Sequence, residues 1–162
     1  MNGDGSVAGP MDFGSGHIRP MHALDPGLVY DASYQEYLLF ACAGAGAQLD
    51  RSIPCPARPP APYQLNHPSV VVHSLNGSVT VHRTVTNVGG NEARYSVAVV
   101  EPVGVSVKVS PRRLSFARTG EKKAFKIKME AKGRSSGKFL AGSYAWGDGV
   151  HVVRSPIVVL VA

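Results

Sequence analysis

Strict alternation of apolar and polar residues dominates the second half of the chain. In residues 79–86 valines alternate with threonine and histidine, in 105–110 valines alternate with serine and lysine, and in 125–129 large apolar residues alternate with lysines. A period of two is typical of a strand with one buried face and one solvent-facing side. The pattern therefore predicts several half-buried strands from about residue 64 onward.

Turn signals separate these strands and indicate how they are connected. They are Asn76-Gly77, Gly89-Gly90-Asn91, Thr119-Gly120, Gly137 and Asp148-Gly149. About seven or eight short strands in one domain predict an all-β, antiparallel sandwich of the fibronectin-III-like or immunoglobulin-like kind. No Cys…Trp…Cys spacing is present, so a disulfide-centred immunoglobulin domain is excluded. Trp146 is the natural large residue of the core.

One short helix is predicted before the sandwich. Ser33 followed three residues later by Glu36 is a capping-box pattern, and Gly44 and Gly46 end the helix. Tyr34, Tyr37, Leu38 and Ala41 share one helical face. We expect this helix either to dock on the sandwich through that face or to fray.

The flanking segments lack periodic apolar residues. Residues 1–31 are rich in glycine and proline and are expected to form loop and turn, with the first twenty or so residues poorly ordered. Five prolines fall within nine residues between Pro54 and Pro62. Neither helix nor sheet interior tolerates this density, so residues 47–63 are expected to form an extended, semi-rigid linker.

Charge is concentrated in one stretch of this 162-residue chain, which has a net charge of +6. Residues 112–138 carry ten Lys or Arg against Glu121 and Glu130. Because Lys126 and Lys128 alternate with apolar residues, a solvated strand face explains them, and polyanion binding is the alternative. We expect no nucleic-acid partner, since no nucleic-acid motif or aromatic interleaving accompanies the charge. No apolar run is long enough for a membrane helix, so no membrane partner is expected.

Candidate chemistry is sparse. Ser15 lies between two glycines, but no strand-to-helix elbow follows it, and no phosphate-binding glycine loop occurs. Cys42 and Cys55 are thirteen positions apart, which fits neither a redox C-x-x-C pair nor half of a zinc site. We therefore expect no catalytic residue, cofactor or metal ion in this chain.

Five sequence segments, in this order, resemble the C-terminal region of plant-type subtilases, which are secreted serine endopeptidases of the subtilisin superfamily. They are DFGSGHIRPMHALDPGLVYD (residues 12–31), LNHPS (65–69), RTVTNVGG (83–90), GVSVKVSPRRLSF (104–116) and GSYAWGDGVHVVRSPIVV (142–159). The resemblance implies a fibronectin type-III-like domain. It also places the Gly-Thr-Ser-Met motif of the nucleophile, and its Asp and His partners, upstream of this sequence.

The resemblance implies four parts. Residues 1–31 correspond to the tail of a truncated catalytic domain, 32–46 to a linker helix, 47–63 to the Pro-rich linker and 64–162 to the sandwich. The expected function is non-catalytic support of the subtilase catalytic domain in cis, in an extracellular (apoplastic) protein. A freestanding module that binds proteins or wall polymers, from a truncated subtilase gene, is the alternative, and a remnant without present role is a third. No signal peptide is visible, which suggests a fragment, and the oligomeric state is left open.

Two modifications follow if the parent is secreted. Asn76-Gly77-Ser78 is the only N-glycosylation sequon, and it lies at a predicted hairpin tip. An even cysteine count in a secreted protein favours a disulfide between Cys42 and Cys55, with two free thiols as the alternative. A bridge across so short a loop would contribute roughly 3 kcal/mol in the chain-entropy model.

Overall fold

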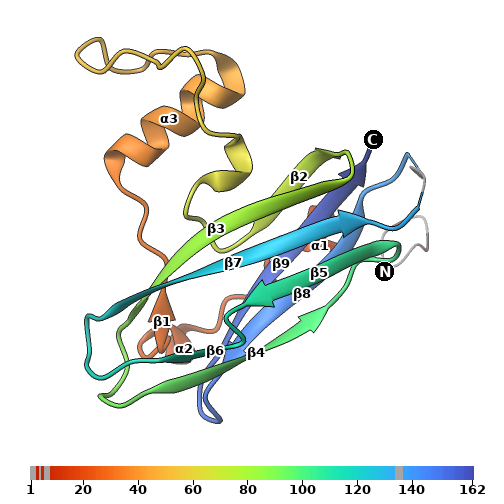
Figure 1. Ribbon diagram of the computed structural model, residues 1–162. Coiled ribbons are helices and arrows are strands. Elements are labelled where there is room, and N and C mark those ends of the chain that lie inside the picture. Colours follow the sequence, from red (N-terminus) through yellow and green to blue (C-terminus); the bar gives the residue numbers. More distant parts are fainter. Residues whose placement is uncertain (1–2, 4, 6–7, 134–136) are drawn as a thin grey trace.

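The computed structural model describes residues 3, 5, 8–133 and 137–162, and shows two packed β-sheets (Figure 1). One sheet has the strand order β1-β3-β7-β5 and the other has the order β2-β9-β8-β4-β6. The strands are β1 (Leu28–Val29), β2 (Val70–Leu75), β3 (Ser78–Asn87), β4 (Arg94–Val100), β5 (Val105–Ser110), β6 (Arg113–Ser115), β7 (Lys122–Ala131), β8 (Leu140–Gly147) and β9 (Val152–Val161).

This arrangement confirms the predicted β-sandwich. All pairs are antiparallel except β2 and β9, which run parallel. The predicted turns connect the strands, and glycines with positive φ occupy four of them: Gly77 between β2 and β3, Gly120 between β6 and β7, Gly137 between β7 and β8, and Gly149 between β8 and β9. A residue without a Cβ adopts this backbone conformation without steric cost.

Side chains from both sheets fill the core between them. Phe125 packs edge-on against Tyr144 and Trp146, with ring centroids 5.8 Å and 5.2 Å apart. Trp146 is fully buried, as predicted, and the alternation on β7 holds because Phe125, Ile127 and Met129 are buried while the lysines between them are exposed. The basic residues Lys126 and Lys128 therefore lie on a solvated strand face.

A buried arginine interrupts the apolar series on β3. Arg83 is 2% exposed and lies on the core side of the strand between Val81 and Val85. Its guanidinium donates hydrogen bonds to the carbonyls of His67 (2.8 Å), Tyr63 (3.0 Å), His82 (2.8 Å) and Ser69 (3.3 Å). Arg83 therefore holds the segment that leads into β2 against the edge of the sandwich, and compensates its own burial by hydrogen bonding.

Two side-chain amides cover the free edge of β3 beside this segment. Gln64 accepts from the N–H of His82 and donates to the carbonyl of Thr80, at 3.0 Å and 2.8 Å. Asn66 accepts from the N–H of Thr84 and donates to its carbonyl, each at 2.9 Å. These amides replace a neighbouring strand and satisfy backbone groups that would otherwise form an open edge.

Helix α3 (Tyr34–Ala45) forms where the sequence predicts it. Ser33 and Glu36 make the reciprocal capping box, and Gly46 ends the helix in the left-handed conformation. The predicted docking face is wrong: Tyr34 and Tyr37 are 66% and 50% exposed, and only Leu38 of the four residues is buried. Apolar residues of α3 occur on every side of the helix, so their spacing does not select one face for packing. The helix packs on the short 3-10 helix η1 (Pro62–Gln64) and stands away from the sandwich (Figure 1).

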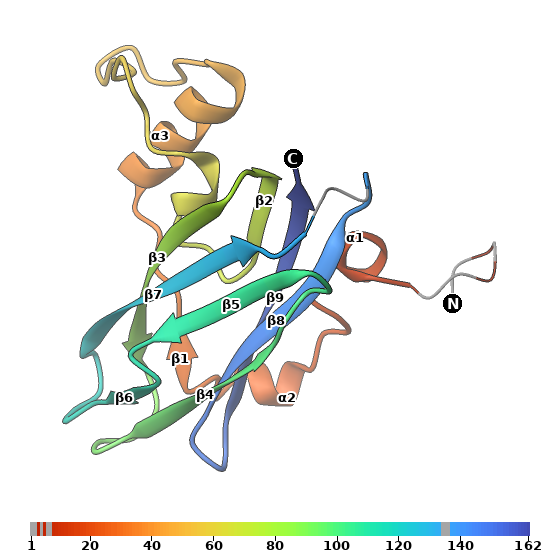
Figure 2. The same ribbon diagram turned by 45° about the vertical axis from the view of Figure 1, so that its right-hand side comes forward.

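Residues 8–31 contain more structure than the loop and turn that were expected. They form two single-turn helices, α1 (Pro10–Phe13) and α2 (Pro20–Ala23), and the strand β1. Figure 2 shows α1 and α2 on the side of the sandwich formed by β8 and β9, whereas β1 joins the other sheet. No helix among the described residues is long and apolar enough to cross a membrane.

Candidate interaction site at the amino-terminal segment

The residues just before α3 are built into the sandwich. Strand β1 pairs antiparallel with the end of β3, Leu28 opposite Asn87 and Val29 opposite Thr86. The side chain of Leu28 is 2% exposed and belongs to the core. We call residues Asp25–Asp31 the anchor, because they fix the amino-terminal segment to the sandwich.

Two side chains at the end of the anchor add polar contacts. Tyr30 shares hydrogen bonds with the hydroxyls of Tyr144 (3.0 Å) and Ser155 (3.2 Å), and burial raises its pKa. Asp31 accepts a hydrogen bond from the Thr86 hydroxyl at 2.6 Å and lies 3.3 Å from the Lys122 ammonium. These two partners lower the pKa of the Asp31 carboxyl, the Thr86 bond being the larger cause.

The start of the anchor contacts two turns, the one between β3 and β4 and the one between β8 and β9. The Gly27 carbonyl accepts from the N–H groups of Val88 and Gly89, at 2.9 Å and 3.1 Å. A Cβ on Gly27 would lie 2.6 Å from the Tyr95 hydroxyl and 2.8 Å from the His151 ring, so only glycine fits this position, whose φ is +73°. Asp25, immediately before, lies 3.1 Å from His151 Nε2.

Upstream of the anchor, the segment presents apolar side chains to solvent. Unlike β1, residues 10–24 add no buried side chain to the core, since every residue from Met11 to Leu24 is exposed. The large apolar side chains and their exposed fractions are Met11 (62%), Phe13 (48%), Ile18 (86%), Met21 (79%) and Leu24 (80%). Because several exposed apolar side chains fall within one segment, this segment is a candidate interaction site. We call these five residues the apolar surface.

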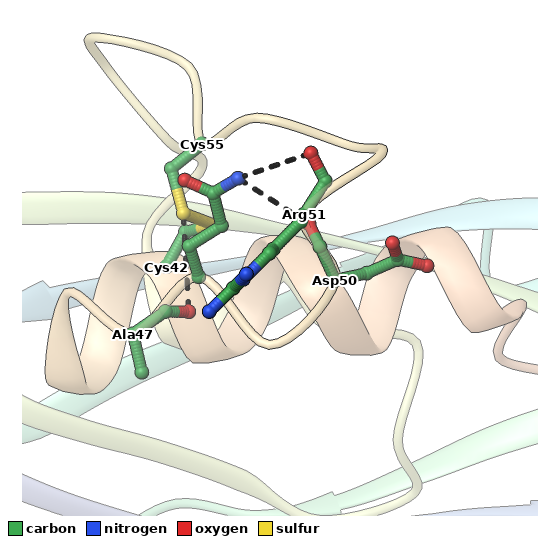
Figure 3. Close-up of a disulfide and its surroundings, with 6 residues drawn as sticks. Cys42, Ala47, Asp50, Arg51 and Cys55 are labelled. Atoms are coloured by element: carbon green, nitrogen blue, oxygen red, sulfur yellow. Dashed lines mark hydrogen bonds between the residues drawn. A yellow bond between two sulfur atoms is a disulfide. The ribbon is translucent and has the colours of Figure 1, made fainter.

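The structure places Cys42 and Cys55 together, far from the apolar surface. Their sulfurs are bonded to each other and join α3 to the Pro-rich loop (Figure 3). Gln48 Nε2 donates to the carbonyls of Asp50 and Arg51 within the same loop, at 3.4 Å and 3.5 Å. This arrangement closes α3 and the loop into one small unit. Among the described residues, no group of three or more His, Cys, Asp or Glu side chains is placed to hold a metal ion.

The other residues singled out from the sequence lie apart from one another. Asn76 is exposed at the turn between β2 and β3. Ser15, His17 and His22 are exposed in the amino-terminal segment, with no hydrogen bond joining them among the described contacts. They do not form a catalytic group.

One serine–histidine contact was not anticipated. The Ser69 hydroxyl lies 2.8 Å from His67 Nδ1. The two residues belong to one local turn, because the Ser69 N–H also donates to Nδ1, and no described carboxylate orients the ring. A nucleophile and base need an orienting group and oxyanion donors as well, so this pair is structural.

Together, the two sheets and their pairing define a fibronectin type-III-like sandwich that includes a strand from the amino-terminal segment. The chain belongs to that family: the model of the fibronectin type-III domain matches residues 64–159. Its curated relatives are plant subtilisin-like proteases, and the chain matches their C-terminal region. It is 46% identical to subtilisin-like protease SBT5.6 of Arabidopsis thaliana, over 98% of this chain, and 42% identical to subtilisin-like serine-protease S of Lotus japonicus, over 95%.

The chain spans about a fifth of the length of these relatives, 21% in both cases. The match thus covers the region that carries the fibronectin type-III-like domain. The family model begins at residue 64, whereas the sheet begins at Leu28. The anchor is therefore a structural element that the periodic pattern did not reveal, although the Asp-Pro-Gly sequence before two apolar residues was a signal for it.

Proposed function

We propose that this chain is the non-catalytic C-terminal part of a secreted subtilisin-like serine endopeptidase, and that it supports the catalytic domain in cis. The observation that carries the proposal is the apolar surface, five exposed side chains in a segment whose downstream end is fixed in the sandwich. The catalytic triad, on this proposal, belongs to the remainder of the protease, and this chain has no hydrolytic activity of its own.

The anchor explains how the support would work. Strand pairing and the burial of Leu28 fix the anchor, which directly follows residues 10–24, to the sandwich. If the catalytic domain covers the apolar surface, it is thereby held rigidly to the sandwich rather than through a flexible linker. Burial of five large apolar side chains would supply a substantial share of the interface free energy, at about 25 cal/mol per Å².

Two-part assembly tests the proposal. The upstream region of the parent protease and this chain are produced separately, and their association is measured by calorimetry together with the thermal inactivation of the protease. We expect Ile18→Asp combined with Met21→Asp to abolish association, because each places a charge in an apolar interface. In the absence of this chain, the catalytic region should lose activity at a lower temperature.

Val103 and Leu49 provide the matched control. They are 83% and 71% exposed, Val103 on a turn of the sandwich and Leu49 in the loop after α3, and both lie outside the apolar surface. Val103→Asp combined with Leu49→Asp should leave association unchanged. If both double variants bind equally well, the apolar surface is not the contact and the proposal fails.

Secretion is part of the same proposal, and it makes two modifications testable. Expressed through a eukaryotic secretory pathway, the chain should carry a glycan on Asn76 and a bridge between Cys42 and Cys55. Peptide mass spectrometry before and after glycosidase treatment and reduction measures both, with Asn76→Gln as the control. A secreted product with an unmodified Asn76 would contradict the glycosylation proposal, and extracellular localisation rests on the relatives alone.

A freestanding module that binds acidic wall polymers is the alternative. Lys108 and Lys128 lie directly opposite each other on β5 and β7, and like charges in this position are unfavourable without a counter-charge. Only Glu130 faces Lys128 among the described residues, at 3.7 Å. Retention of the chain on immobilised polygalacturonate, lost in Lys108→Glu combined with Lys128→Glu, would favour this alternative.

A further inference from the structure

His151 lies between two carboxylates that come from distant parts of the chain. Its Nδ1 is 2.7 Å from Asp148 Oδ2, in the turn between β8 and β9, and its Nε2 is 3.1 Å from Asp25 Oδ2, in the anchor. The ring is 16% exposed. Tyr95 of β4 completes the group, because its hydroxyl and the ring both pack against Gly27. Among the described residues, Asp25, Asp148 and Tyr95 are the titratable groups that face the ring.

The hydrogen-bond pattern fixes which nitrogen carries a proton. Asp148 Oδ1 accepts from the N–H groups of Val150 and His151, at 2.9 Å and 2.6 Å, so its carboxylate is ionised and acts as an acceptor on Oδ2 as well. Nδ1 of His151 must then donate. In neutral histidine this leaves a lone pair on Nε2 that faces the Asp25 carboxylate, and two electron-rich groups repel each other.

Protonation removes this conflict. The imidazolium donates from Nδ1 to Asp148 and presents a positive Nε2 to Asp25. The second contact is ionic rather than a well-aligned hydrogen bond, since no partner of Nε2 meets hydrogen-bond geometry. We propose that His151 is a protonation-dependent latch, which holds the anchor on the sandwich when charged and releases Asp25 and Gly27 when neutral.

The pKa directions agree with this geometry. Asp148 and, to a lesser extent, Asp25 raise the pKa of His151. A raised histidine pKa contributes stability that is fully present at acidic pH and is lost as the pH rises through the raised value. Burial alone would raise the pKa of Asp148, but its hydrogen bonds with His151 and Val150 lower it overall. Its contribution is therefore fully present above the ordinary carboxyl pKa and is lost as the pH falls through the lowered value. The latch is therefore closed at mildly acidic pH and open in alkali.

Release would affect the anchor without unfolding the sandwich. The Val88 and Gly89 amides, which donate to the Gly27 carbonyl, report on the anchor, whereas the fully buried Trp146 reports on the core. This inference concerns contacts within the chain and stands whether or not the proposed function is correct. If a catalytic domain covers the apolar surface, the latch would make its attachment to the sandwich dependent on pH.

Nuclear magnetic resonance of the full chain, titrated from about pH 5 to about pH 9, tests the latch. We expect the Gly27, Val88 and Gly89 amides to titrate with the same midpoint as the His151 ring. Asp25→Asn should lower that midpoint, because it removes one of the two negative charges. His151→Gln should abolish the pH dependence of the three amides and leave the anchor as weakly held at acidic pH as in the alkaline wild type.

His82→Gln is the matched control, since His82 is exposed on β3 and far in sequence from the latch. It should leave all three amide titrations unchanged. Tryptophan fluorescence of Trp146 verifies that each variant is folded, and Asp25→Asn keeps the test valid if His151→Gln does not fold. Amides that titrate independently of His151, or an unchanged midpoint in Asp25→Asn, would overturn the latch.

Discussion

At the residue scale, large buried side chains carry most of the specificity of this fold. Trp146 and Phe125 form the centre of the core, and Arg83 places a guanidinium where the alternation alone predicts an apolar residue. Four backbone carbonyls accept hydrogen bonds from that guanidinium, so its burial is tolerated although no acidic side chain in the described part of the chain pairs with it. Single residues thus connect the two sheets to the segments that precede them.

Replacement of Trp146 by alanine tests the core directly. Because the side chain is fully buried, Trp146→Ala should lower the free energy of unfolding by about 3–5 kcal/mol, measured by urea denaturation. Val150→Ala, at an 83% exposed position nearby on the turn, should change it by less than about 0.5 kcal/mol. A cost below about 1 kcal/mol for Trp146→Ala would contradict the assignment of the core.

At the element scale, the edge of β3 shows how side chains substitute for a strand. Strand β1 pairs with two residues of β3, and the amides of Asn66 and Gln64 bond backbone groups of Thr80, His82 and Thr84 on the same edge. Helix α3 depends on its caps and on the disulfide, since it contacts the remainder of the fold mainly through η1. The two elements therefore differ in what stabilises them.

The amide of Asn66 can be tested by a nearly isosteric change. In the wild type, Asn66 Nδ2 donates to the carbonyls of Asp31 and Thr84. Asn66→Asp keeps the acceptor for the Thr84 N–H but replaces this donor with an oxygen, which faces the two carbonyl oxygens. We expect a loss of about 1–3 kcal/mol in unfolding free energy, and more aggregation from the opened edge.

Asn91→Asp is the control for this substitution. Asn91 uses its side-chain oxygen to accept from the Thr119 N–H, at an exposed position, and aspartate retains that bond. Its unfolding free energy should stay within about 0.5 kcal/mol of wild type. Equal stability of the two variants would mean that Asn66 does not act through its donor.

Reduction of the disulfide should act on one element alone. The bridge between Cys42 and Cys55 restricts a short loop, and its loss would remove roughly 3 kcal/mol from the local stability of α3. Hydrogen exchange should therefore become fast in α3 after reduction and remain slow in β3 and β7. Cys42→Ser combined with Cys55→Ser should behave alike. Simultaneous loss of protection in the sandwich would show that α3 is required for the whole fold.

At the scale of the whole molecule, the anchor changes where the domain begins. The sequence pattern and the family model both start the sandwich at residue 64, but the sheet already includes β1. The segment before α3 therefore divides into two parts. Residues 10–24 should exchange quickly, whereas the paired residues Leu28 and Val29 should be protected.

Two truncated chains test whether the anchor belongs to the stable domain. Residues 25–162 contain the anchor, and residues 32–162 lack it but keep α3 and the disulfide. We expect the longer chain to unfold with a free energy higher by about 2–4 kcal/mol, since Leu28 alone contributes about 1.5–3 kcal/mol through burial and the Tyr30 contacts add to it. Equal stability, measured by urea denaturation under identical conditions, would restore the boundary at residue 64.

The sequence by itself determined the features that depend on local order. Alternation specified which faces of β5 and β7 are buried, turn residues marked the hairpins, and the Ser33 capping box with Gly46 limited α3. Each of these signals acts within a few residues, where spacing, backbone conformation and capping chemistry are visible in the chain. The order of the five motifs likewise indicated the family.

Only the tertiary structure decided the contacts between distant residues. In the folded chain, Asp25 contacts His151, Leu28 pairs with Asn87 and Asn66 bonds to Thr84. These partners are far apart in the sequence, and no periodic pattern of residues indicates such contacts. It also turned Tyr34 and Tyr37 outward, because a helix with apolar residues on every side has no face that spacing alone can assign. Partners for such groups are fixed by packing of the two sheets, and that packing exists only once the chain has folded.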